Sequence, residues 1–275
     1  MPLPLPRTLS PSKVSSFKEC ALAFRFSAID RLPEPPSVPA VKGTTVHRAL
    51  ELLFVGDVAD RTPERARACL DEALSEMADD PEYQGLELDD SGAVDFASDA
   101  ARMVERYFTL EDPTRIRPIG LELMLTADLG PVTVRGIIDR LELDEDGELL
   151  VTDYKTGRAP APAQQASRLG GVHFYSMLCE QVLGRRPRRI QLIYLGRDPQ
   201  IITTDTSEQS NRGVERKVRA VWDAIERACE RDDFRPRPGP LCSWCAFQAY
   251  CPSFGGDPSL ASAAVPVQMG TAPAG

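Results

Sequence analysis

GIIDRLELDEDGELLVTDYKTG, residues 136–157, is the stretch that decides the fold. Apolar and β-branched residues flank a polar middle, which predicts two strands at 132–143 and 149–155. Asp146-Gly147 in the middle is a dipeptide typical of a tight hairpin turn. The stretch therefore predicts two neighbouring antiparallel strands, the second of which ends in charged residues.

Charged side chains lie at the ends of these two strands. Residues two apart on a strand share a face, so Asp153 and Lys155 point together, and Asp139 on the first strand can lie beside Asp153. Adjacent carboxylates are unfavourable unless positive charge lies between them, and a divalent cation supplies it. Lys155 can then hold or deprotonate a water or stabilise a phosphate, which suits phosphodiester hydrolysis. The alternative is a surface ion pair, because Asp-x-Lys alone is common.

The whole stretch resembles the core motifs of the PD-(D/E)XK nuclease superfamily, in particular its RecB-like and Cas4-like exonuclease branch. A strand aspartate, a hairpin and an Asp-Tyr-Lys-Thr-Gly strand recur there. The resemblance implies an α/β fold: a restriction-endonuclease-like mixed β-sheet core flanked by helices, with an α-helical insertion. It also implies catalytic roles for Asp139, Asp153 and Lys155, Mg²⁺ or Mn²⁺ as the cofactor, and DNA as the substrate.

A histidine on an early helix extends the resemblance. KGTTVHRALELLF, residues 42–54, places His47 shortly after a Gly-Thr, as in that family. The resemblance assigns His47, Asp139, Asp153 and the backbone carbonyl of Tyr154 to one metal ion. Taken alone, a histidine in an apolar helical stripe is more often a core residue.

Two further positions match the family pattern less closely. Glu122 corresponds to a recurrent glutamate, with an exposed strand residue as the equal alternative. The family helix after the lysine strand carries Gln-x-x-x-Tyr; here Tyr175 supplies the tyrosine, as a catalytic-site residue or a core residue, but Gly171 replaces the glutamine. The candidates to substitute for that glutamine are Gln164, Gln165 and His173.

The cysteines form a second group. Cys242, Cys245 and Cys251 are spaced C-x2-C-x5-C, and closely packed thiolates repel unless a metal takes up their charge. Cys20 is the candidate fourth ligand, although a lone cysteine is by default a buried apolar residue. The arrangement resembles the iron-sulfur staple of the same nuclease branch, which implies a 4Fe-4S cluster joining the two chain ends; a structural Zn²⁺ site is the alternative. The remaining cysteines are predicted core residues: Cys69, Cys179 and Cys229.

Composition shifts divide the chain into five expected segments. They are a lead-in and helix with Cys20 at 1–43, a helical region with His47 at 44–117, the nuclease core at 118–206, a helix and cysteine segment at 207–256, and a disordered tail at 257–275. The proline-rich stretch 31–40 is expected not to be helical. The expected helices are 14–26 capped by Ser12, 44–55, 63–77, 93–109, 164–183 and 207–230. The expected strands are 119–127, 132–143, 149–155, 190–195 and an edge strand at 201–204.

Composition also limits the protein class. The chain is 42% apolar and 27% charged, as in ordinary globular proteins, and has neither an apolar run long enough to span a bilayer nor a secretory signal pattern. We therefore expect a cytoplasmic protein without membrane contact. The net charge of -9 argues against indiscriminate coating of nucleic acid. Local basic clusters at 184–189 and 211–220 are either a DNA groove or solvated surface charge.

These observations predict a metal-dependent exonuclease that acts on single-stranded DNA ends in repair or recombination. Strand class comes from the resemblance alone. The sequence contains no P-loop of the G-x-x-x-x-G-K-[ST] kind, so a helicase or repair partner is expected to supply any unwinding. The alternatives are a non-catalytic DNA-binding or assembly subunit that keeps the nuclease fold, and a zinc-stapled protein of unrelated function.

Overall fold

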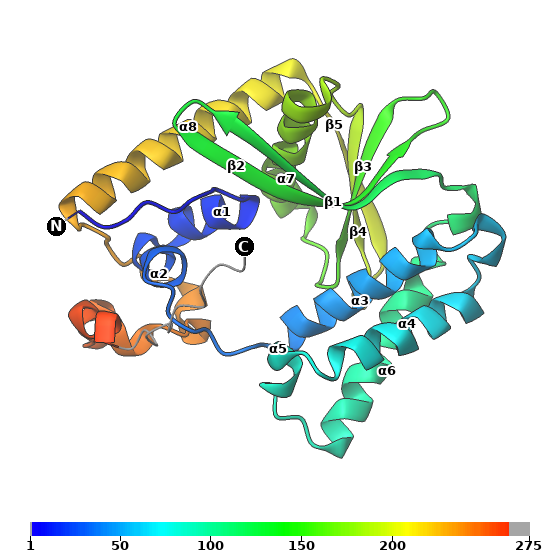
Figure 1. The fold of residues 1–275 in the computed structure, drawn as a ribbon, viewed down its shortest axis with the longest axis horizontal. Helices are drawn as coiled ribbons and strands as arrows, with labels where there is room; N and C mark the ends of the chain where they lie inside the picture. Colours follow the sequence, from blue (N-terminus) through cyan, green and yellow to red (C-terminus); the bar gives the residue numbers. More distant parts are fainter. Residues whose placement is uncertain (1, 264–275) are drawn as a thin grey trace, which may run out of the picture. The chain divides into compact units, whose positions relative to one another are not determined.

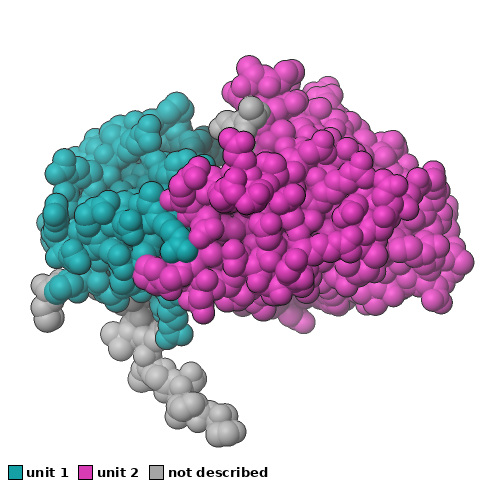
Figure 2. All heavy atoms as spheres, turned by 90° about the horizontal axis from the view of Figure 1, so that it is seen from above, with its two compact units in different colours: residues 1–35, 217–275 teal, residues 36–216 magenta. Residues whose placement is uncertain are grey.

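The computed structural model describes residues 2–263, apart from the side chains of 166–168 and 170. The chain forms two compact units (Figure 2). We call Pro36–Arg216 the sheet unit, and Met1–Pro35 together with Lys217–Gly275 the cysteine unit. Within the described residues, no helix has the length and apolarity needed to cross a membrane.

A five-stranded mixed sheet forms the centre of the sheet unit, with strand order β1-β2-β3-β4-β5. All neighbouring strands pair antiparallel except β3 and β4, which are parallel. Parallel neighbours need a crossover, and helix α7, Pro162–Leu183, supplies it. The predicted α/β class, mixed sheet and edge strand are confirmed. The strands are β1 Pro118–Leu129, β2 Val132–Leu143, β3 Leu149–Lys155, β4 Arg189–Tyr194 and β5 Gln200–Asp205.

The β2–β3 hairpin forms where the Asp-Gly dipeptide predicted it. Gly147 has a φ of 76°, a left-handed conformation that favours glycine, and its N–H donates to the carbonyl of Asp144 at 2.9 Å. β2 pairs with β3 only as far as Arg140 and Thr152. Beyond this pair the β1–β2 hairpin diverges from β3 (Figure 1), and α7 packs against β1, β2 and β4.

The helical part of the sheet unit contains α3 Val38–Val55, α4 Pro63–Met77, α5 Pro81–Gln84 and α6 Asp90–Tyr107. Helix α3 begins inside the stretch 31–40, so the prediction that this stretch is not helical was wrong at its end. Ser37 caps α3 by accepting from the N–H of Ala40, and Pro39 lies in the first turn, where no helical hydrogen bond is lost. The short α5 was not predicted.

The core of the sheet unit joins these helices to the sheet. Apolar side chains of α3, α4 and α6 pack together with Tyr154 of β3 and with Ile193 and Leu195 at the end of β4. Figure 1 shows the three helices beside one another along the sheet. This packing fixes α3, and with it His47, against the end of β3.

The cysteine unit begins with α1 Pro11–Glu19, α2 Ala21–Phe24 and a π-helical turn at Arg25–Ile29. The predicted single helix 14–26 is wrong, because the backbone at Cys20 is extended (φ −157°, ψ 109°). Its first cap is also corrected: Ser10, rather than Ser12, accepts from the N–H of Lys13 at 3.2 Å. The break separates the direction of the Cys20 side chain from the helical stripe before it.

Helix α8, Glu208–Arg231, contributes residues to both units. Short 3-10 helices follow in the cysteine unit: η4 Pro240–Trp244, η5 Gln248–Tyr250, η6 Pro252–Phe254 and η7 Pro258–Ala263. The tail predicted to be disordered therefore has a helical beginning, with Ala261 fully buried. The rest of that prediction, 264–275, lies outside the described residues.

A glycine contact between the ends of β3 and β4 generates the first prediction. A Cβ on Gly196 would lie 2.6 Å from the carbonyl oxygen of Gly157, whereas a Cβ on Gly171 in α7 would meet no atom within 4 Å. Gly196→Ala should therefore lower the free energy of unfolding by about 1–3 kcal/mol. Gly171→Ala should raise it by about 0.5–1 kcal/mol, because alanine is the better helix former. Urea denaturation of both variants measures this, and an unchanged midpoint for Gly196→Ala would contradict the close approach.

Candidate active site

Three carboxylates occupy matching positions on three neighbouring strands. The register of β1 and β2 places Glu122 opposite Asp139. Arg140 and Thr152 are the final pair of the β2–β3 ladder, so the next residues, Asp139 and Asp153, lie where the two strands separate. The structure thus brings the predicted aspartates to one fork in the sheet and adds Glu122 to them.

Helix α3 brings His47 to the same fork. Its Nδ1 lies 3.6 Å from Asp139 Oδ2 and 3.8 Å from Glu122 Oε1, and its Nε2 lies 3.1 Å from the backbone carbonyl oxygen of Tyr154. Among the described residues, His47, Glu122 and Asp139 form a group whose ligand atoms all lie within 4.8 Å of one another. Such a group has the composition of a divalent cation site.

Asp153 lies against the lysine two residues farther along β3. Its Oδ2 is 2.5 Å from Lys155 Nζ, which agrees with the expectation that the two side chains point together. Asp153 is nearly fully buried, whereas the Lys155 side chain is 43% exposed. The predicted metal set contained Asp153 rather than Glu122; the structure places Glu122 in the tight group and pairs Asp153 with Lys155.

The carboxylates carry too much negative charge for their surroundings. Burial, with added repulsion from Asp153, raises the pKa of Asp139 well above its usual value. Burial raises the pKa of Glu122 to about 7, with further contributions from Glu51 and Asp153. Burial lowers the pKa of His47, which favours the neutral imidazole that binds metals. A divalent cation at this position would relieve the repulsion, so the residues present fit a bound metal.

Glu122 is also held in an unusual backbone conformation. Its φ of 42° lies in the left-handed region, which costs a non-glycine residue about 1–2 kcal/mol. Strain of this kind persists only where surrounding structure enforces it, and it often occurs at functional sites. The strand pattern around Glu122 gave no sign of this conformation, and the sequence left its role open because it matches the family glutamate only loosely.

Helix α7 places Tyr175 at the site. Burial raises the pKa of the Tyr175 hydroxyl, and the nearby charges of Asp153 and Asp139 raise it further. Gly136 allows the helix to lie this close to β2, because a Cβ there would be 2.8 Å from Leu178 and 3.3 Å from the Tyr175 ring. At Gly171, one turn earlier, the space within 4 Å is empty.

A buried arginine lies behind the site. Arg140, adjacent to Asp139, is fully buried and donates to the hydroxyl of Tyr154 at 2.7 Å and to both carboxylate oxygens of Glu111 at 2.9 and 3.0 Å. It also donates to Thr152 at 3.2 Å. Three further side chains complete this Arg140 network: Glu142, Gln191 and Tyr107.

The Arg140 network acts on the site through Tyr154. The N–H of Tyr154 donates to Asp139 Oδ2 at 2.6 Å, and its carbonyl oxygen faces His47. The backbone of one residue therefore contacts both candidate ligands while its side chain is held by Arg140. The sequence analysis did not predict this role. The only signal in the sequence is that Asp139 is followed by Arg140 and Asp153 by Tyr154, which places polar groups on both faces of these two strands.

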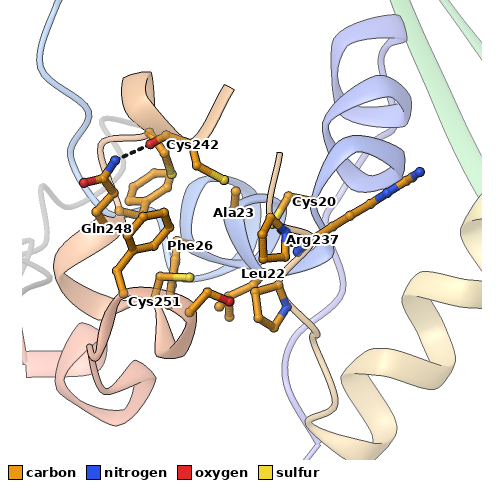
Figure 3. A pocket seen from close by; sticks show the side chains of 14 residues that line it. Cys20, Leu22, Ala23, Phe26, Arg237, Cys242, Gln248 and Cys251 are labelled. Atoms are coloured by element: carbon orange, nitrogen blue, oxygen red, sulfur yellow. Dashed lines mark hydrogen bonds between the residues drawn. The ribbon is translucent and has the colours of Figure 1, made fainter. Parts of the chain in front are cut away.

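The four cysteines predicted to bind a cluster line one pocket in the cysteine unit (Figure 3): Cys20, Cys242, Cys245 and Cys251. Backbone N–H groups point at the sulfurs, from Arg237 to Cys20 Sγ at 3.4 Å and from Gly239 to Cys242 Sγ at 3.3 Å. Such contacts favour sulfur that carries negative charge. Burial raises the pKa of the Cys245 thiol, and the other three cysteines raise it further. The remaining cysteines, Cys69, Cys179 and Cys229, are buried, as predicted.

The spacing of these sulfurs is wide. Across the described residues, no three of the cysteine sulfurs lie within 4.8 Å of one another. A tetrahedral zinc with Zn–S bonds of about 2.3 Å holds its thiolates about 3.8 Å apart. The pocket in this structure is therefore wider than a zinc site of four thiolates.

The basic cluster 184–189 is neutralised by acidic partners. The cluster's arginines reach five acids: Arg185 to Glu148, Arg186 to Glu180, Arg188 to Asp144 and Asp146, and Arg189 to Asp205. Exposed pairs of this kind contribute little stability, but they reduce the positive potential that a phosphate backbone would meet. The structure favours solvated surface charge over a DNA groove for this cluster.

A family comparison agrees with the fork of carboxylates and lysine. The model of the PD-(D/E)XK nuclease superfamily matches residues 8–252, which is most of the chain. The fold and the site define a nuclease-superfamily protein, and the chain belongs to this superfamily.

Two individual proteins are similar to the chain over most of their length. "Gene 69 protein" of Mycobacterium phage D29 is 23% identical over 268 residues, which cover 89% of this chain and 96% of the phage protein. A crystal structure from Eubacterium rectale, named "Putative exonuclease", superposes with a TM-score of 0.54 at 11% identity and covers 87% of each chain. At that identity the superposition supports the fold alone.

The Arg140–Tyr154 contact generates the second prediction. Tyr154→Phe removes one hydrogen bond from a charged donor and should lower the free energy of unfolding by about 1–3 kcal/mol. It should also weaken Mn²⁺ binding measured by calorimetry, because the Tyr154 backbone contacts Asp139 and His47. Tyr83→Phe is the control and should change stability by less than about 0.5 kcal/mol. Equal stability and Mn²⁺ affinity in Tyr154→Phe and the unchanged protein would contradict this role.

Proposed function

We propose that this protein is a metal-dependent DNA exonuclease of the RecB or Cas4 type that hydrolyses phosphodiester bonds at single-stranded ends in repair or recombination. The observation that carries the proposal is the fork at which His47, Glu122, Asp139, Asp153 and Lys155 converge. Superfamily membership supports hydrolysis of nucleic acid. The exonuclease branch rests on the Asp-Tyr-Lys-Thr-Gly strand and the cysteine spacing.

The candidate metal ligands are His47, Asp139, Asp153 and the carbonyl of Tyr154, with Glu122 as a further ligand. The contacts of His47 Nδ1 with Asp139 Oδ2 at 3.6 Å and with Glu122 Oε1 at 3.8 Å support these residues as ligands of one ion. The Tyr154 carbonyl lies 3.1 Å from the other ring nitrogen, Nε2, so it joins the set only if the imidazole turns. Bound Mg²⁺ or Mn²⁺ would stabilise charge on the phosphate and lower the pKa of a water. The imidazole makes Mn²⁺ at least as suitable as Mg²⁺.

Lys155 and Tyr175 are the candidate catalytic side chains beside this set. The Lys155 ammonium, held next to Asp153, can position the attacking water and donate to a non-bridging phosphate oxygen as charge develops there. Tyr175 lies near the charges of Asp153 and Asp139, and its hydroxyl can donate to either carboxylate. The Lys155 ammonium and the Tyr175 hydroxyl both carry a proton close to the aspartates, and hydrolysis requires such a proton donor or acceptor beside the reacting water.

A non-catalytic DNA-binding subunit is the second candidate, and Gly171 is the observation that favours it. The superfamily branch carries glutamine there, whereas this chain leaves the space around that position empty. An intact carboxylate and lysine set favours the enzyme over this alternative, and one assay separates them.

End-labelled single-stranded DNA with Mn²⁺ or Mg²⁺ provides the third prediction. Asp139→Ala and Lys155→Ala should each reduce cleavage by about 100-fold or more, because positioned charge and proton transfer are each worth at least that much. DNA affinity and the unfolding midpoint of Lys155→Ala should change little. Lys42→Ala is the matched control, since Lys42 also forms a carboxylate ion pair, with Asp99 at 2.9 Å. Full cleavage by Lys155→Ala would remove Lys155 from the catalytic site, and no cleavage by the unchanged protein would favour the non-catalytic subunit.

We propose a 4Fe-4S cluster held by Cys20, Cys242, Cys245 and Cys251. Four thiols on one pocket and N–H groups directed at two of the sulfurs support a cluster of thiolates. The sulfur spacing supports iron-sulfur over zinc, because a four-iron cluster is wider than a single ion. Since Cys20 and Cys251 lie far apart in sequence, the cluster would tie the first helices to the last segment and add to folding stability.

Iron content provides the fourth prediction. Protein purified without oxygen should be brown, with broad absorbance at roughly 400 nm, which is typical of thiolate-bound iron. Cys20→Ser should lower iron content and thermal stability together, whereas Cys69→Ala should leave iron unchanged because Cys69 is buried in the sheet unit. Colourless protein with one equivalent of zinc would replace the cluster by a zinc site.

A further inference from the structure

An exposed tryptophan stands next to the cysteine pocket. In the 3-10 helix η4, residues three apart lie above one another, so Leu241 and Trp244 share one side of the helix. Cys242 and Cys245 line the pocket, whereas Leu241 is 65% exposed and Trp244 is 86% exposed. The segment therefore turns its sulfurs inward and presents the indole to solvent.

This exposure is unusual for tryptophan. The chain has two tryptophans, and the other one, Trp222, is only 5% exposed. An indole is a large apolar surface that is mostly buried in folded proteins. Trp244 remains in water on a short element that is followed directly by a pocket cysteine, so it is presented on a constrained support rather than on a free loop.

The charge near this indole is positive, in contrast to the rest of the chain. The cysteine unit has 11 lysines and arginines against nine acids, a net charge of +2, whereas the sheet unit has 21 against 32, a net charge of −11. Residues 234–256, which contain Trp244, include no acid and two arginines: Arg235, which pairs with Asp233, and Arg237. A polyanion is therefore attracted to the cysteine unit rather than to the acidic sheet unit.

Two cations lie next to Cys20, at Lys18 and Arg237. Arg237 lines the pocket (Figure 3), and its guanidinium donates to the backbone carbonyl of Lys18 at 3.0 Å. A phosphate at this place would meet two positive charges.

We propose that Trp244 stacks on a base of single-stranded DNA while Lys18 and Arg237 bind its phosphates. Aromatic side chains beside basic groups bind single strands in this way, and stacking requires no particular base. Bases in a duplex are already stacked on one another, so the site selects unpaired strands. The inference rests on the proposed nuclease function only for the choice of DNA as ligand, and it names the part of the chain that recognises unpaired strands.

Intrinsic fluorescence tests the stacking, because Trp222 is buried and Trp244 is exposed. Oligo-dT is titrated into the iron-loaded Lys155→Ala protein, which prevents digestion. Quenching of the indole emission should persist in Trp222→Phe and disappear in Trp244→Phe. An abasic oligonucleotide of equal length should not quench, because it offers phosphates without bases.

Affinity provides the second measurement. Trp244→Ala should weaken oligo-dT binding by about 5- to 100-fold, the usual loss for one stacked base, and Trp244→Phe should restore part of it. Leu241→Ala is the matched control and should change affinity by less than twofold, because it removes exposed apolar surface from the same side of η4 without removing a π-face. Blunt duplex of equal length should bind more weakly than oligo-dT.

Equal affinity for oligo-dT in Trp244→Ala and the parent, without quenching, would overturn the proposal. If the parent instead forms dimers that Trp244→Ala abolishes, the indole serves a protein contact and the proposal also fails. Failure of the exonuclease function gives a different result. If oligo-dT binds and quenches the indole emission but the unmutated protein never cleaves DNA, the stacking site stands and the enzyme assignment fails.

Discussion

The buried guanidinium of Arg140 is the interaction on which the sheet unit depends. It has no contact with water and donates to Glu111, Thr152 and the Tyr154 hydroxyl. A buried charge is tolerated only when paired and hydrogen bonded, and removal of one partner costs about 3–5 kcal/mol. The pairing therefore fixes β2, β3 and the residues after α6 in one arrangement. Its effect reaches the site because Tyr154 also contacts Asp139 and His47 through its backbone.

The two sides of these strands carry opposite electrostatic problems. On one side a buried cation is compensated by carboxylates and hydroxyls. On the other side Glu122, Asp139 and Asp153 repel one another, with Lys155 as their nearby cation. The buried cation on the first side is compensated by groups of the protein itself. The carboxylates on the second side would be compensated by a bound cation. Strain at Glu122, with its φ of 42°, is maintained within the same rigid surroundings.

The cysteine unit adds a different constraint. Cys20 belongs to the first helices and the other three cysteines to the last segment, and a shared pocket brings them together. Cys242 of η4 lines this pocket, and another side of the same short helix presents Trp244 to solvent. The unit with the positive net charge thus holds the exposed aromatic group, while the acidic unit holds the candidate hydrolytic site. The proposed stacking site for DNA and the proposed hydrolytic site therefore belong to different parts of the sequence.

Helix boundaries and side-chain partners were less predictable than the strands. The stretch 31–40 predicted an extended connector, yet α3 begins at Val38 because Pro39 is tolerated in a first turn that Ser37 caps. The helix 14–26 was predicted as continuous, and the extended backbone at Cys20 divides it. Arginines at 184–189 indicated either a groove or surface charge, and only their acidic partners in the fold decided between them. Local propensity describes single segments, whereas these outcomes depend on contacts between segments.

The sequence by itself determined the β2–β3 hairpin and the shared face of Asp153 and Lys155, because alternation and an Asp-Gly turn are local signals. The mixed α/β fold was predicted from the resemblance of the motifs to the nuclease superfamily. Tertiary structure alone decided that Glu122 joins His47 and Asp139, since residues on a helix and two strands meet only after the sheet forms. It alone decided that Arg140 is buried and paired, as a lone arginine in a strand is equally compatible with solvent. The physical reason is distance in sequence: periodicity gives the direction of a side chain, and packing gives its partner.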